Sequence, residues 1–100
     1  MKKLVYGLLA GAMALTSVQA FAADALTLQL KWVAQAQFAG YYVAKDKGFY
    51  TDEGIDITIK AGGPDVAPEQ VIAGGGADVI VDWMGGALAA REQGVPLVNI

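Results

Sequence analysis

The alternation of apolar and polar residues predicts three strands and the beginning of a fourth. Residues 26–30 and 55–60 place Leu or Ile at every second position, which is the period of a strand with one buried face. Residues 77–81 contain a continuous apolar run, which is typical of a strand covered on both faces in a parallel sheet. Residues 97–100 are again apolar and predict the start of a fourth strand.

A first helix is predicted at residues 38–47. Aromatic side chains recur there at spacings of three and four, so we expect Phe38, Tyr42 and Phe49 to face the sheet. Gly48 follows as the expected C-terminal cap, because glycine readily adopts the left-handed conformation that ends many helices.

Two further helices are predicted at residues 68–73 and 84–93. Pro68 is suited to a first helical position, where a backbone N–H is not needed. In the last helix we expect Leu88 and Ala89 to point inward. The order β-α-β-α-β-α-β predicts an α/β fold with a parallel sheet and right-handed crossovers.

The first 22 residues predict a cleaved signal peptide rather than part of this fold. Lys2 and Lys3 precede an apolar stretch at residues 4–18, and residues 20–22 read Ala-Phe-Ala, a small-x-small cleavage pattern. The apolar stretch is shorter than the ~20 residues that span a bilayer, which disfavours a membrane anchor. We expect cleavage after Ala22, with Ala20 as the alternative, and a mature domain at residues 23–100 in the periplasm, without membrane insertion.

The composition excludes several classes of function. The chain has no Cys and no His, and its one Ser, Ser17, lies in the expected signal peptide, so no familiar nucleophile–base pair or zinc site can form. The net charge is −3, and Lys2 and Lys3 account for two of the seven basic residues, so the mature domain is more acidic still. An acidic domain disfavours nucleic acid as a partner. We expect no enzyme activity, no cofactor and no metal.

Candidate binding residues follow the predicted strands, because ligands of open α/β sheets bind at the carboxyl ends of the strands. An indole can stack on a flat ring, and a carboxylate can accept hydrogen bonds from an amino group. The set therefore favours a neutral or weakly cationic nitrogen heterocycle, although backbone N–H groups at helix starts leave an anion possible. The candidates are Trp32, Gln35, Gln37, Phe38, Asp65, Asp82, Trp83 and Gly85.

Each of these residues also has a purely structural interpretation. Trp32 can close the edge of the core, Asp65 can stabilise a turn, and Asp82 can cap the last helix. The three glycines at 74–76 do not predict a phosphate site, because they end a helix and precede a strand, the reverse of a phosphate-binding loop.

The mature sequence resembles the THI5/NMT1-like branch of ABC-transporter substrate-binding proteins. The resemblance covers nearly all mature residues and is carried by the start at Trp32, by Gly-Tyr-Tyr-Val-Ala at 40–44, by Gly-Phe-Tyr at 48–50 and by Glu-Gly-Ile at 53–55. It implies a two-lobed type II periplasmic-binding fold, of which this chain would be the beginning of the first lobe. The apolar residues at 97–100 likewise lead us to expect a longer protein.

The resemblance implies a binding protein that delivers a small solute to an ABC permease in the inner membrane, and we expect it to be a monomer. Relatives near this branch bind thiamine-precursor pyrimidines. Biosynthetic relatives instead make such a pyrimidine, and they carry a histidine where Phe38 stands here, together with a cysteine-rich motif. A biosynthetic enzyme, a binding protein for alkanesulfonate, taurine or riboflavin, and a truncated remnant that binds nothing are the alternatives.

Overall fold

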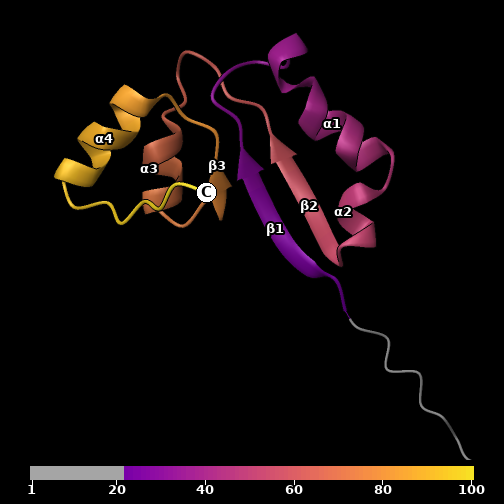
Figure 1. Ribbon diagram of the computed structural model, residues 1–100. Coiled ribbons are helices and arrows are strands. Elements are labelled where there is room, and N and C mark those ends of the chain that lie inside the picture. Colours follow the sequence, from indigo (N-terminus) through magenta and orange to yellow (C-terminus); the bar gives the residue numbers. More distant parts are fainter. Residues whose placement is uncertain (1–21) are drawn as a thin grey trace, which may run out of the picture.

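The computed structural model describes residues 22–100, which form an α/β unit around a three-stranded parallel sheet (Figure 1). The strands are β1 (Asp24–Gln29), β2 (Ile55–Lys60) and β3 (Val79–Ile80), in the order β2-β1-β3. The predicted α/β class and parallel sheet are therefore confirmed. The expected signal peptide lies, up to residue 21, outside the described residues.

The strand β1 is central and pairs with both neighbours. Its pairing with β2 runs from Asp24 opposite Ile55 to Gln29 opposite Lys60, whereas β3 pairs only through Val79 and Ile80. Two further backbone hydrogen bonds extend the contact with β3: the N–H of residue 78 donates to the carbonyl of residue 27 and that of residue 81 to residue 29, both at 2.9 Å. The third strand is thus shorter than the predicted 77–81, but the residues on either side of it continue the hydrogen bonding to β1.

The helices lie in two groups, one beside β2 and one beside β3 (Figure 1). The chain moves from β1 to β2 in one direction and then returns past β1 to β3. Right-handed crossovers in opposite directions place their helices on opposite faces of the sheet. None of the helices between residues 22 and 100 is both long enough and apolar enough to cross a bilayer. The first group holds η1 (Ala36–Phe38), α1 (Ala39–Asp46) and α2 (Phe49–Asp52), and the second holds α3 (Pro68–Ala73) and α4 (Met84–Glu92).

The predicted first helix is correct in place but wrong in its continuation. Gly48 adopts φ 76° and ends α1, as expected, but a second short helix, α2, begins directly after it. The left-handed glycine changes the direction of the axis, so the spacing that starts at Phe38 does not continue through it. Phe49 is consequently 55% exposed and does not face the sheet, while Tyr50 packs against the core in its place.

The inward face predicted for α4 is also wrong. Leu88 is 53% exposed and Ala89 is exposed, whereas Ala90 is buried. The predicted fourth strand at 97–100 does not form, because the N–H of Leu97 donates to the carbonyl of Val95 at 2.8 Å instead of pairing with the sheet. The apolar residues 79–81 are only half-buried, so the complete coverage expected for β3 is not seen among the described residues.

The core gathers at the carboxyl half of β1. Leu28, Leu30, Phe38 and Ile57 form one buried cluster, and Leu30 has no exposed surface. The partly buried rings of Trp32, Tyr41, Tyr42 and Tyr50 pack around this cluster. Burial along β1 rises from its exposed first residues to its fully buried end. The best-packed part of the molecule therefore supports the edge where the strands end.

Gln29 is the polar residue buried within this region. Its side-chain Nε2 donates to the carbonyl of Leu30 at 2.9 Å and to those of Lys60 and Ala61 at 3.4 and 3.2 Å. It is 4% exposed. A single amide thus joins the ends of β1 and β2, and its burial is compensated by these acceptors.

We predict that Gln29→Leu lowers the free energy of unfolding by about 1–3 kcal/mol, because it removes the donor shared by the buried carbonyl of Leu30 and the part-buried carbonyls of Lys60 and Ala61. Urea unfolding followed by circular dichroism measures the change. The control is Gln70→Leu on the exposed side of α3, for which we expect a change within about 0.5 kcal/mol. Equal stability of Gln29→Leu and the unmodified protein would contradict the role assigned to the amide.

Candidate functional site

The candidate site lies where β1 and β3 end side by side. The connections that leave these strands move apart, β1 toward β2 and β3 toward α4, which is the arrangement that opens a crevice at the carboxyl edge of a parallel sheet. Gln29 lies opposite Ile80. Two residues beyond this pair on each strand, the same register brings Lys31 opposite Asp82.

Lys31 and Asp82 form an ion pair across this edge. The Lys31 Nζ lies 3.0 Å from the Asp82 Oδ1, and the two side chains are 15% and 4% exposed. The same Nζ lies 5.0 Å from the centre of the Trp83 ring, within the range of a cation–π contact. The ion pair therefore connects two strand ends and holds an indole beside them.

The two oxygens of Asp82 have different surroundings. Oδ1 accepts from Lys31 and also from the backbone N–H of Trp83 at 2.8 Å. Oδ2 is buried and has no hydrogen-bond partner in the described part of the chain, and the same is true of Glu69 Oε2. The alternative role of Asp82, as a cap of the last helix, is only partly realised. Its carboxylate accepts from the backbone N–H of Trp83, the residue before α4, and makes no cap hydrogen bond to the helix itself.

The loop after β2 is held against the loop after β1. The N–H of Gly62 donates to the carbonyl of Trp32 at 2.9 Å. Gly62 has no room for a side chain, because a Cβ there would overlap the backbone of Leu30 and Lys31. Asp65 follows in this loop and is exposed. No hydrogen bond or ion pair within residues 22–100 joins it to Asp82.

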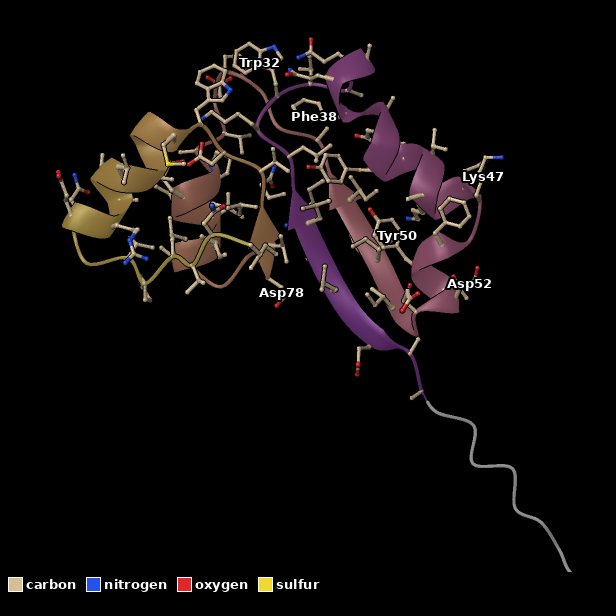
Figure 2. All side chains as sticks on the ribbon, in the orientation of Figure 1. Trp32, Phe38, Lys47, Tyr50, Asp52 and Asp78 are labelled. Carbon is tan, nitrogen blue, oxygen red and sulfur yellow. The ribbon has the colours of Figure 1, made fainter. Side chains whose placement is uncertain are left out.

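The remaining candidates divide into wall and surface residues. Trp32 is half-buried and packs against the core, and Phe38 is 4% exposed within it. Both lie at the carboxyl end of the sheet, whereas Asp78 lies at the opposite end of β3 (Figure 2). Gln35, Gln37 and Gly85 are exposed, as is Trp83, with 63% of its surface accessible.

Sequence reasoning missed Lys31 and Glu69. Neither is among the eight candidates chosen from the residues that follow the predicted strands. The first could have been found from the strand order, because parallel pairing of β1 and β3 aligns it with Asp82. Nothing in the local pattern marks Glu69, whose proximity to Asp82 depends on how α3 and α4 pack. Among residues 22–100, no three potential metal-ligating side chains gather in one place.

Comparison with known proteins assigns the chain to a family. The model of the family described as NMT1/THI5 like matches residues 35–100. The chain belongs to this family. The match includes the loops after β2 and β3 and most of the described fold, so the resemblance expected from the sequence is confirmed.

One curated relative of this NMT1/THI5-like chain is the formylaminopyrimidine-binding protein of Halalkalibacterium halodurans. The two are 25% identical over 79 residues, which is 79% of this chain and 24% of the relative. The chain thus spans about a quarter of the length of the relative it matches. No solved structure matches it.

We predict that Lys31→Met lowers the free energy of unfolding by roughly 3 kcal/mol, because it leaves the buried Asp82 carboxylate without its cation. The double variant Lys31→Met/Asp82→Asn should recover part of this loss, since the amide oxygen can still accept from Trp83. Urea unfolding of both single variants and the double variant gives the coupling energy.

Lys47→Met, which removes an exposed lysine, is the matched control and should change the unfolding free energy by no more than about 0.5 kcal/mol. Strictly additive effects of the two substitutions at Lys31 and Asp82 would show that the pair does not contribute to stability.

Proposed function

We propose that this chain forms part of a solute-binding protein for a small nitrogen heterocycle, most simply an aminopyrimidine. The observation that carries the proposal is the Asp82 carboxylate, which is fixed at the crevice edge by Lys31 while one of its oxygens remains without a partner. A related binding protein is named for a formylaminopyrimidine, which supports the same ligand class.

In this proposal the ligand ring stacks on Trp32 and its amino group donates to Asp82. Trp83 supplies a second exposed indole at the same edge. Gln35, Gln37 and Asp65 provide polar groups on the surrounding loops, and the exposed backbone at Gly85 allows close approach at the start of α4. Phe38 does not contact the ligand in this proposal; its buried ring belongs to the core cluster against which Trp32 packs.

Electrostatics favour an amine over an anion at this edge. Lys31 is the cation at the crevice, and it is already paired with Asp82. A sulfonate or phosphate would therefore meet a neutralised lysine and an additional carboxylate, Glu69, rather than a free positive charge. This arrangement argues against alkanesulfonate and taurine as ligands.

In this proposal the protein binds its ligand without transforming it. The chain lacks Cys and His, and Phe38 stands where the resemblance seen in the sequence implies a histidine in the biosynthetic relatives. We further propose that the whole protein is exported by the N-terminal segment at residues 1–22 and delivers its ligand to an ABC permease. A second lobe would supply the opposite wall of the cleft.

We predict that Trp32→Ala weakens binding of 4-amino-2-methylpyrimidine roughly 5- to 150-fold, the equivalent of the ~1–3 kcal/mol that aromatic stacking contributes per base. Isothermal titration calorimetry of the protein measures the dissociation constant. Trp32→Phe is the matched control, because it keeps an aromatic face and should retain most of the affinity. Unchanged affinity of Trp32→Ala would exclude stacking on this ring.

A further inference from the structure

Glu69 and Asp82 approach the same point beside α4, although they lie on different elements. Glu69 belongs to the first turn of α3, and Asp82 precedes α4. A Cβ placed on Gly86 would lie 3.5 Å from Asp82 Oδ2 and 3.8 Å from Glu69 Oε1. Both carboxyl groups therefore lie within contact distance of the position that a side chain at residue 86 would occupy.

The two carboxyl groups are incompletely satisfied. The Asp82 side chain is 4% exposed, and its Oδ2 has no partner among the described residues. Glu69 Oε2 is likewise buried and without a partner in that part of the chain. A buried acceptor without a donor costs about 1–3 kcal/mol, and more when it is charged. Asp82 approaches the Gly86 position with its unpartnered Oδ2, and Glu69 approaches it with Oε1, the other oxygen of the carboxyl group whose Oε2 has no partner. Two carboxyl groups that meet in this way, each with an unpartnered oxygen, indicate a binding position for a donor.

The charges indicate what kind of donor fits. Lys31 is paired with Asp82 through Oδ1, and the backbone N–H of Trp83 donates to the same oxygen. The pair of carboxyl groups therefore retains an excess of negative charge and two free acceptor positions. An exocyclic amino group on a heteroaromatic ring has two N–H donors on one nitrogen, whereas a ring carbonyl at the same position has none.

We propose that Glu69 and Asp82 form an acceptor pair that selects an amino-substituted pyrimidine over its oxo-substituted counterpart. This inference rests on the proposed function and adds Glu69 to the residues that bind the ligand. Because both oxygens are buried, binding of the amino group requires a neighbouring side chain to move. Trp83 and Met84 follow Asp82 directly and are 63% and 64% exposed, so their movement sacrifices little packing.

The test compares two probes, 4-amino-2-methylpyrimidine and 4-hydroxy-2-methylpyrimidine, by calorimetry. We expect the unmodified protein to prefer the amino compound at least tenfold. Glu69→Gln replaces an acceptor with an amide that also presents N–H groups, so the preference should fall about tenfold while binding of the hydroxy compound changes little. Glu92→Gln removes an exposed carboxylate from α4 and should keep the full preference.

A second variant tests the position of residue 86. Gly86→Ala places a methyl group in contact with the Asp82 carboxylate, and we expect it to weaken binding of the amino compound at least tenfold. Gly40→Ala is the control for adding a methyl group to a helix, because its Cβ would meet no atom within 4 Å. A thermal melt of each variant separates loss of folding from loss of binding.

The outcomes distinguish this inference from the proposed function. Failure of the unmodified protein to bind either pyrimidine would overturn the proposed function, and the inference with it. Binding with an intact preference in both Glu69→Gln and Gly86→Ala would overturn the inference alone. A lowered melting temperature of Glu69→Gln with an unchanged preference would also overturn it, because Glu69 would then serve the fold only.

Discussion

The ion pair between Lys31 and Asp82 is the constraint on which the candidate site depends. It closes the distance between the ends of two parallel strands that the chain reaches more than fifty residues apart. Because both side chains are largely buried, neither can be replaced without leaving a charge behind. The pair also fixes the direction of the Asp82 carboxylate and brings the indole of Trp83 over the lysine. The geometry of the candidate site thus depends on an electrostatic contact inside the protein.

The other side of the edge is held by close backbone contact instead of charge. Gly62 brings the loop after β2 against the end of β1, and the buried amide of Gln29 joins the same two strands through carbonyl groups. The central strand is therefore fixed from both neighbours by different means. An ion pair on one side permits adjustment of side chains, whereas the glycine contact on the other permits almost none. The more adaptable wall is the one that carries the proposed amino-binding groups.

Sequence patterns predicted the first two strands well, because alternation reports directly on which residues are buried. The continuous apolar runs were less informative, since β3 is shorter than predicted and residues 97–100 form no strand. Sequence patterns predicted the helices less well. The periodicity that begins at Phe38 fails at Gly48, where a left-handed residue changes the helix axis, and the apolar residues of α4 do not mark its buried face. The candidate site residues were chosen because they follow strands, and their role in binding stays a prediction. Lys31 required the strand order, and Glu69 required the packing of two helices, which no local pattern contains.

The gradient of burial along β1 has a consequence for the motions of the sheet. Its first residues are exposed, and its end is enclosed by the core and by the Gln29 amide. Opening fluctuations should therefore start at the end near Asp24 and stop before they reach Leu30. In terms of amide exchange with deuterated solvent, protection should rise steadily along one strand. The sheet would therefore open first near Asp24 and stay closed at the edge where the candidate site lies.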